Sequence, residues 1–197
     1  GVAFEFRWQT PRARGLWDRA FALGSIGAAV AQGLALGALV QGIPVSGRAY
    51  AGGWGDWLTP FSALTALGLT LGYALQGACW IIMKTDERLQ RQAYDLARWL
   101  APAFLATIAA VSLWTPFLSA TYSANWFSWP RILLVAPVPL LVAAAGFVLI
   151  TGIAREKERW PFLATQALFV LGFAGLGVSF YPYMVPNSVT IWQAAAP

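Results

Sequence analysis

The side chains with the clearest potential for chemistry are one amide and two aromatic rings in an apolar segment. Tyr73 lies three residues before Gln76 and Trp80 four residues after it, so a helix would place all three on one face. Such a face could contact a quinone head group or a lipid, or the amide could form a hydrogen bond with a neighbouring helix. We favour the interhelical hydrogen bond, because most buried membrane amides do only this.

Side chains that usually bind metals are scarce. The sequence has no histidine, and Cys79 is its one cysteine. Histidine is the commonest ligand of haem, copper and zinc, so we expect no catalytic, metal-binding or cofactor-binding residue in this chain. A single cysteine forms no internal disulfide, and we interpret Cys79 as a small packing residue.

The composition is that of an integral membrane protein. Of the 197 residues, 58% are hydrophobic and 11% are charged, against about 25% charged residues in an ordinary soluble domain. Trp57–Thr85 contains the clearest span, because a helix of about 27 residues rises about 40 Å and crosses a hydrocarbon core of about 30 Å. The net charge of +5 does not indicate nucleic-acid binding, since the basic residues lie in several short loops and are better explained by membrane orientation.

These features predict an all-α bundle of transmembrane helices that forms a single domain over residues 1–197. The predicted spans cover about 20–43, 57–83, 99–119, 131–153 and 161–181. Gly42 and Pro44 should end the first span, and Pro137 and Pro139 should kink the fourth. The charged segment 84–98 has few apolar residues, so we expect a short amphipathic helix at the surface there.

The remaining segments are expected to be loops or turns. Trp126 and Trp129 fall in a loop before the fourth span, and residues 154–160 form a tight charged turn. Residues 182–197 carry no charge. Because the sequence begins with Gly1 rather than Met, we expect a fragment of a longer membrane subunit.

The basic residues predict the orientation. Eleven of the thirteen Lys and Arg residues lie in segments 1–19, 84–98 and 154–160, and the other two are Arg48 and Arg131. Positive residues stay on the cytoplasmic side, so the N-terminus is predicted to be cytoplasmic and the C-terminus periplasmic. Tryptophans at the predicted boundaries should act as interfacial anchors, namely Trp17, Trp57, Trp99, Trp129 and Trp160.

No Asp, Glu, Lys or Arg lies in the middle of any predicted span. An intramembrane ion is costly and marks a functional site by default. Proton pumps, proton-coupled carriers and voltage sensors usually contain one, so we infer that these helices alone do not handle ions. The polar residues left inside the spans are hydroxyls and amides, the latter being Gln32, Gln41, Gln76 and Gln166.

Two glycine pairs predict helix contact faces. Gly33 and Gly37 form one GxxxG pair, and Gly68 and Gly72 form another. The ten-residue segments around them agree at six positions, which would suit an inverted repeat. We prefer to explain the similarity as chance agreement between two helices that are both rich in Gly, Ala and Leu. The fifth span presents a similar face with Gly172, Gly175 and Ser179.

Several segments together resemble subunit II of the cytochrome bd-type quinol oxidases, including their cyanide-insensitive branch. The matching segments, in chain order, are GVAFEFR (1–7), WDRAFALGS (17–25), AQGLALGALVQGIPV (31–45), DWLTPFSALTALGLTLGYALQGACWIIMKT (56–85) and YPYMVPNSVTIWQAAAP (181–197). The family's second subunit has about nine spans, so this resemblance implies that the first three and the last are missing here.

The resemblance implies a non-haem subunit of a multi-pass complex in the bacterial inner membrane. The complex would couple quinol oxidation to oxygen reduction and to a proton gradient. Its haem b and haem d, or b-type haems alone, would lie in the partner subunit I. The implied partners are that subunit in a heterodimer, lipid and quinone, with room for a small accessory subunit.

Two functions from other classes stay open at this stage. A transporter or permease fragment would explain the kinked fourth span and the suggestion of an inverted repeat, but it lacks an intramembrane charge. A scaffold for lipid or membrane assembly is the weaker option.

Overall fold

The computed structural model describes residues 11–47, 49–129, 132–186 and 188–195, and helices dominate it. Five helices are long and apolar enough to cross a membrane. They are α2 (Arg14–Gln41), α3 (Pro60–Lys84), α4 (Glu87–Trp114), α7 (Pro137–Ala154) and α8 (Trp160–Phe180). The predicted all-α fold with five potential transmembrane helices is therefore confirmed.

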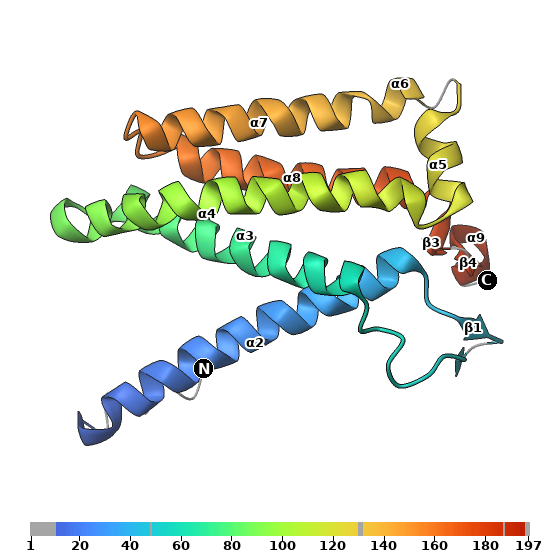
Figure 1. Ribbon diagram of the computed structural model, residues 1–197, viewed down its shortest axis with the longest axis horizontal. Helices are drawn as coiled ribbons and strands as arrows, with labels where there is room; N and C mark the ends of the chain where they lie inside the picture. The colour runs from blue at the N-terminus through green and yellow to red at the C-terminus, as the bar shows by residue number, and fades with distance from the viewer. Residues whose placement is uncertain (1–10, 48, 130–131, 187, 196–197) are drawn as a thin grey trace.

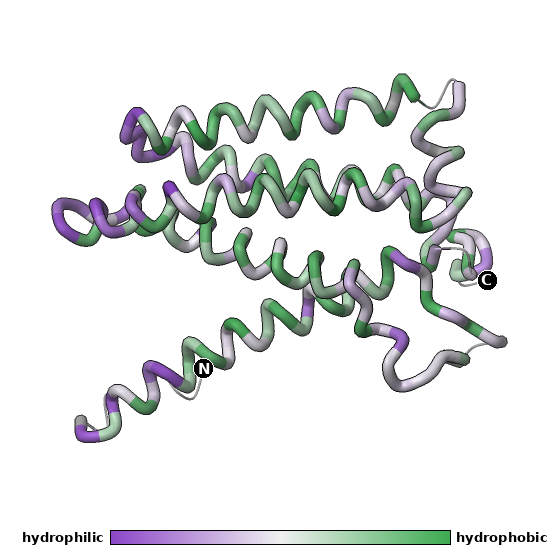
Figure 2. The backbone as a smooth tube through the Cα atoms, in the orientation of Figure 1, coloured by the Kyte–Doolittle hydropathy of each residue, from purple (hydrophilic) through white to green (hydrophobic). Residues whose placement is uncertain are grey.

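Four of these helices lie side by side, and the fifth diverges from them (Figure 1). Helix α3 contacts α4 and α8, and α7 also contacts both α4 and α8, so the four form a closed bundle. Helix α2 contacts α3 near its own C-terminal end and then leads away from the bundle. Hydrophilic residues gather where α3 meets α4 and where α7 meets α8 (Figure 2). We call this the charged end of the bundle, and the opposite end the hairpin end.

Helix α2 ends as predicted but starts earlier. Gly42 follows it with a φ of 93°, a conformation that favours glycine, and Pro44 cannot continue the helix. The helix begins at Arg14, six residues before the predicted membrane span. Charged side chains near a helix end can reach the aqueous boundary, so they do not stop the backbone from remaining helical.

The two glycine pairs lie at two different helix interfaces. A Cβ atom on Gly33 would collide with the Cα atom of Ala66, and one on Gly37 with the Cα atom of Ser62. These glycines therefore let the backbones of α2 and α3 touch.

The second glycine pair faces α4 instead. A Cβ atom on Gly68 would lie 3.2 Å from Thr107 Oγ1, and one on Gly72 would lie 2.7 Å from Phe104 Cε2. The predicted contact faces of both pairs are thus confirmed. In the fifth span, Gly175 approaches α7 but Gly172 has nothing within 4 Å, so that part of the prediction is wrong for Gly172.

Helix α3 begins with a capping box. The Thr59 side chain accepts from the Ser62 amide at 3.0 Å, and the Thr59 amide donates to Ser62 Oγ at 2.9 Å. Pro60 occupies the first turn, where its missing N–H costs no hydrogen bond. The helix consequently starts three residues later than the predicted position 57.

The separate amphipathic helix predicted at 84–98 is wrong. Helix α4 runs without interruption from Glu87 to Trp114 and joins that segment to the third span, and η2 (Thr115–Phe117) follows. The few apolar residues of the segment are sufficient to pack it against the bundle, because Ala93, Tyr94 and Ala97 are all buried in the core. No residue after Asp86 in that segment breaks a helix, and its charged side chains project from the bundle end.

The fourth span is interrupted where the prolines predicted a kink. A short helix α6 (Ile132–Val135) precedes α7, whose first turn contains Pro137. The predicted loop before it is wrong in part, because α5 (Ala120–Phe127) includes Trp126. Ser119 caps α5 by accepting from the Thr121 amide at 3.2 Å, as serine often does.

Short elements precede, connect or follow the long helices. These are η1 (Pro11–Ala13) before α2, the antiparallel strands β1 (Val45–Ser46) and β2 (Ala49–Tyr50), the antiparallel strands β3 (Tyr183–Val185) and β4 (Val189–Thr190), and α9 (Ile191–Ala194). All except η1 lie at the hairpin end (Figure 1). Ser188 Oγ donates to the Ile43 carbonyl at 2.9 Å, which joins the chain's last described segment to the end of α2.

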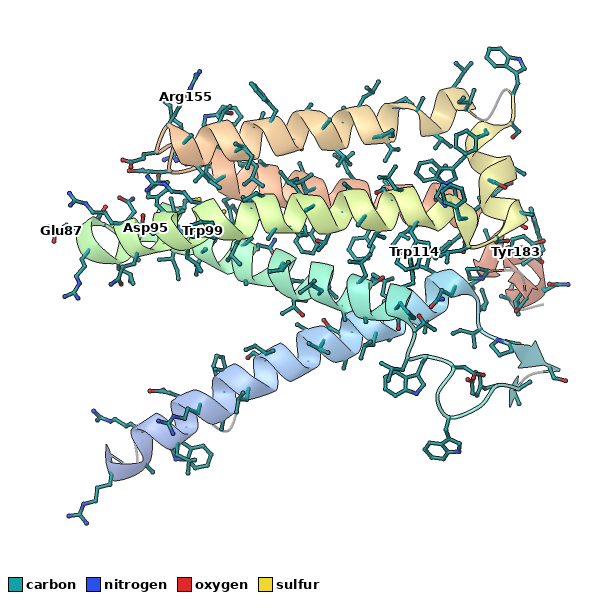
Figure 3. All side chains as sticks on the ribbon, in the orientation of Figure 1. Glu87, Asp95, Trp99, Trp114, Arg155 and Tyr183 are labelled. Atoms are coloured by element: carbon teal, nitrogen blue, oxygen red, sulfur yellow. The ribbon has the colours of Figure 1, made fainter. Side chains whose placement is uncertain are left out.

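The core lies between the four bundle helices, toward the charged end. Leu75, Cys79 and Ile82 of α3 have no exposed surface, and neither does Leu149 of α7. Cys79 is therefore a packing residue, as predicted. The charged end itself is marked by Glu87, Asp95 and Arg155, which point away from the bundle (Figure 3).

Candidate functional site

The predicted face of α3 lies against α8, and pairs of side chains from the two helices contact each other at successive turns. Tyr73 stacks on Phe169, with ring centroids 5.6 Å apart and an angle of 3° between the planes. Seven residues further along α3, Trp80 packs on Phe162 with centroids 5.3 Å apart. We call this surface the α3/α8 seam. Its spacing follows from two antiparallel helices whose contacts recur every three or four residues.

The amide lies between these two aromatic pairs. Gln76 Nε2 donates to Gln166 Oε1 at 2.7 Å, and this confirms the interhelical hydrogen bond favoured for Gln76. Both glutamines were expected inside spans, but their pairing was not predicted. Their similar depth in two antiparallel spans was the one available sequence signal.

The seam is partly open to the surroundings of the protein. Tyr73 is 42% exposed and Trp80 is 48% exposed, and Gln166 is also exposed. At the charged end, Lys84 Nζ lies 5.2 Å from the centre of the Trp80 ring, within the range of a cation–π interaction. The seam therefore presents aromatic rings, two amides and one cation along one accessible face.

A second feature is a cavity of about 210 Å³ inside the hairpin half of the bundle. Its lining is mostly apolar and includes Leu69, Val111 and Leu168. Thr65 and Thr107 also line it, but their hydroxyls donate to backbone carbonyls of their own helices, at 2.8 Å and 2.7 Å. The cavity consequently offers few hydrogen bonds to a guest and suits a small apolar molecule.

The two remaining amides, Gln41 and Gln32, lie outside the seam and differ in their contacts. Gln41 Oε1 accepts from Thr59 Oγ1 at 2.5 Å, which fastens the end of α2 to the start of α3. Gln32 is exposed on α2. In α8, Ser179 Oγ accepts from Trp126 Nε1 at 3.0 Å, so α5 is held against the bundle.

A buried tyrosine that was not predicted as a functional residue supplies a hydrogen bond to the C-terminal end of α2. Tyr122 Oη donates to the Val40 carbonyl at 2.7 Å. In a continuing helix this carbonyl would accept from residue 44, but Pro44 has no amide hydrogen. A proline four residues after a helix carbonyl was therefore the available sequence signal.

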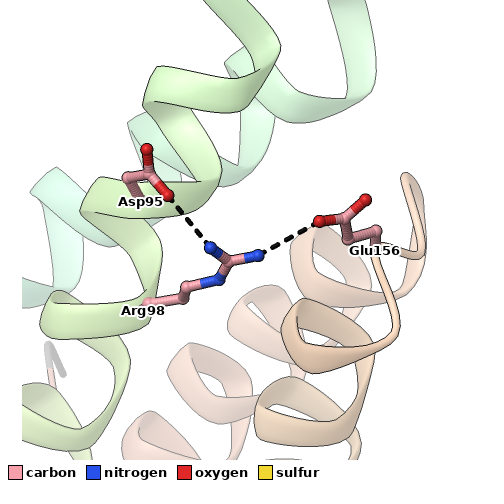
Figure 4. Close-up of polar contacts among 3 residues, drawn as sticks. All are labelled: Asp95, Arg98 and Glu156. Carbon is pink, nitrogen blue, oxygen red and sulfur yellow. Dashed lines mark hydrogen bonds and ion pairs between the residues drawn. The ribbon is translucent and has the colours of Figure 1, made fainter.

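An ion-pair network joins α4 to the α7–α8 turn at the charged end. Arg98 lies 3.0 Å from Asp95 and 3.1 Å from Glu156, as Figure 4 shows. The side chains involved are about half or more exposed. Exposed ion pairs contribute about 0–1 kcal/mol, so we interpret this network as a surface contact.

The hairpin end carries an aromatic recess next to one carboxylate. Tyr50 Oη donates to the Gly53 carbonyl at 2.9 Å, and Asp56 Oδ2 accepts from the Gly53 amide at 2.7 Å. Desolvation and the neighbouring Asp56 raise the pKa of Tyr50. Its phenol therefore remains neutral, and a hydrogen-bond donor, to a higher pH than usual.

The chain lacks the commonest haem ligand. The sequence contains no histidine, and the Cys79 thiol is enclosed by apolar side chains. In the part of the chain that the structure describes, no three His, Cys, Asp or Glu side chains cluster as a metal site would require. The expectation that this chain provides no metal or cofactor ligand stays a prediction.

Most of the predicted anchors lie at helix ends or near them, whereas Trp99 lies within α4. Trp57 and Trp160 lie just before or at the first residue of a long helix. Trp99 is 81% exposed and Trp129 is 78% exposed, and Figure 3 shows Trp99 near the charged end. Their role as interfacial anchors stays a prediction.

Comparison with known proteins connects this architecture to one family. The chain is 22% identical to cytochrome bd-I ubiquinol oxidase subunit 2 of Escherichia coli (strain K12), in an alignment that covers 99% of this chain and 61% of that protein. It is 28% identical to a probable cytochrome oxidase subunit 2 of Haemophilus influenzae over 120 residues, which cover 57% of this chain and 32% of that protein. The chain thus spans about 61% of the length of the first relative.

A family model gives the wider match. The model for cytochrome bd terminal oxidase subunit II matches residues 1–197, and this range contains all five long helices and both glycine pairs. The chain therefore belongs to the cytochrome bd terminal oxidase subunit II family.

Proposed function

We propose that this chain forms part of the non-haem subunit of a bd-type quinol oxidase. The complex oxidises quinol, reduces oxygen to water and builds a proton gradient by taking protons from the cytoplasmic side. The observation that carries this proposal is the family match over residues 1–197. The name of the Escherichia coli relative, a ubiquinol oxidase subunit, supports the substrate class.

The haems belong to the partner, subunit I, with which this subunit forms a heterodimer. That partner carries haem b and haem d, or b-type haems alone, and a small accessory subunit joins in some complexes. The absence of histidine from this sequence supports this division of labour. The location is the bacterial inner membrane, with the charged end of the bundle in the cytoplasm, as the distribution of Lys and Arg predicts.

The bundle supports the haem subunit by packing against it and shielding its low-dielectric interior. The apolar cavity adds a path for dioxygen, a small apolar molecule for which its lining is suited. Ser112 lines that cavity, so Ser112→Phe should raise the apparent KM for oxygen while haem spectra stay unchanged.

Copurification tests the central proposal. The full-length subunit should carry haem spectra when it is expressed with its partner and should lack them when it is expressed alone. Robust haem binding by the subunit alone would contradict the proposal. Solute uptake by the isolated subunit in liposomes would favour a transporter instead.

A further inference from the structure

The aromatic recess at the hairpin end is a hollow that the proposed function does not use. It has a volume of about 890 Å³, and its walls come from the end of α2, from β2 and from the loop before α3. These segments meet at the hairpin end (Figure 1). Three aromatic side chains, Tyr50, Trp54 and Trp57, line the recess together with the carboxylate of Asp56.

Three features of this recess attract a positive charge. Asp56 accepts from the Gly53 amide, but no Lys or Arg forms an ion pair with it within the described ranges. Ala38 and Gln41 bring the C-terminal end of α2 to the wall, where the helix dipole favours cations. The faces of tyrosine and tryptophan rings also attract ammonium groups. The recess is therefore suited to a cation that the described chain does not supply.

The same recess offers a hydrogen-bond donor. The oxygen of the Gln41 side chain accepts from Thr59 Oγ1, so the amide keeps two N–H donors. Among the described residues no acceptor forms a hydrogen bond with them. A phosphate oxygen is a strong acceptor for such a group. The recess thus suits a ligand that carries an ammonium and a phosphate close together, whereas a lysine side chain would satisfy Asp56 alone.

The position of the recess favours a phospholipid over a dissolved amine. Trp57 lies three residues before Pro60, the first residue of α3, and α3 is long and apolar enough to cross a membrane. Tryptophans at such boundaries lie at the level of the lipid head groups. Leu58 is 60% exposed beside Trp57 and supplies apolar contact for an acyl chain.

We propose that the recess binds the head group of phosphatidylethanolamine, with the ammonium between Asp56 and the aromatic rings and the phosphate at the Gln41 amide. The ammonium donates to the carboxylate, and the rings surround its remaining surface. This inference goes beyond the proposed function and does not rest on it, since it requires only a subunit that spans a membrane.

Carbodiimide coupling tests the contact in the full-length subunit, purified with its partner and placed in nanodiscs that contain phosphatidylethanolamine. The reagent joins a carboxylate to a primary amine in contact with it, forming an amide bond with loss of water. The peptide that contains Asp56 should gain the mass of the ethanolamine lipid. Coupling of Asp56 to a lysine peptide, or only to an added soluble amine, would overturn the lipid site.

A charge substitution gives a second and independent readout. Asp56→Asn keeps an acceptor for the Gly53 amide but removes the charge. In native mass spectrometry it should retain phosphatidylethanolamine about tenfold more weakly, as loss of a hydrogen bond to a charged group predicts, with retention of phosphatidylglycerol unchanged. Asp86→Asn is the matched control at the charged end, since Asp86 is exposed and forms no cap hydrogen bond. Equal retention by the wild type and the Asp56 variant would contradict the site.

These results separate the two proposals. If the subunit copurifies with haem spectra but Asp56 gives neither the lipid adduct nor weaker retention, the lipid site is wrong and the proposed function stands. If the subunit carries no haem partner but Asp56 couples to the lipid, the proposed function fails and the lipid site stands.

Discussion

Gly33 of α2 lies directly against the backbone of Ala66 of α3, and a methyl group at position 33 would collide with the Ala66 Cα atom. Gly24, in the diverging part of the same helix, has nothing within 4 Å of such a group. The two glycines therefore have similar chemistry but opposite tolerance for a side chain.

We expect Gly33→Leu to push α2 away from α3 and Gly24→Leu to leave their contact intact. Spin labels at the exposed positions Leu16 of α2 and Leu67 of α3, in a background where Cys79 is Ala, measure the separation of the two helices by pulsed electron paramagnetic resonance. The distance between the labels should change in the Gly33 variant and stay as in the wild type in the Gly24 variant. An unchanged distance in both variants would contradict the tight contact.

Gly72→Leu should lower the thermal stability of the subunit in detergent. The new side chain would meet Phe104 and Phe169, and overpacking of this kind costs about 1–3 kcal/mol. Gly172→Leu is the control, because nothing lies within 4 Å of the added atom. An unchanged melting temperature for Gly72→Leu would count against the contact face on α4.

Tyr122→Phe should destabilise the subunit by about 1–3 kcal/mol, because the Val40 carbonyl loses its donor and Pro44 cannot replace it. Tyr94→Phe provides the comparison. The hydroxyl of Tyr94 is buried and has no hydrogen-bond partner within the described ranges, so its removal should be neutral or slightly stabilising. Unfolding in mixed micelles measures both variants, and equal losses would refute the capping role of Tyr122.

Glu156→Gln should change the free energy of unfolding by less than about 1 kcal/mol. Arg98 keeps Asp95 as a partner, and all the charges are substantially exposed. The small effect should shrink further at high salt. A large loss of stability that persists at high salt would show that this network contributes more than a surface contact.

A reporter fused after Pro197 should be periplasmic, and one fused within the turn at 154–160 should be cytoplasmic. The reason is the concentration of Lys and Arg in alternate connecting segments. Paired alkaline phosphatase and green fluorescent protein fusions measure both positions. A cytoplasmic signal from the fusion after Pro197 would reverse the orientation.

Hydrophobic length and helix breakers predicted most of the fold. Gly42, Pro44 and Pro137 act locally on the backbone, so their effect could be read without knowledge of the neighbours. The course of α4 could not, because whether the residues around Tyr94 are buried depends on the facing surfaces of α3 and α7. Helix α5 was missed because an eight-residue helix carries too little periodicity to be distinguished from a loop.

Only the α3 side of the candidate site could be predicted from the sequence. The face of α3 that contains Gln76 follows from helical periodicity within a single segment. Its partner Gln166 is ninety residues away, and their pairing depends on which helices become neighbours in the bundle. Periodicity within a segment carries no information on that choice.

The ninety-residue separation also has a consequence for biogenesis. Helices α2 and α3 are consecutive, so their glycine contact can form as soon as both have left the translocon, whereas the seam must wait until α8 has been synthesised. Until then the face of α3 that carries Gln76 is exposed to lipid and to quality-control proteases. Truncation before α8 should therefore shorten the cellular half-life of the nascent subunit, while the hairpin of α2 and α3 is already in place.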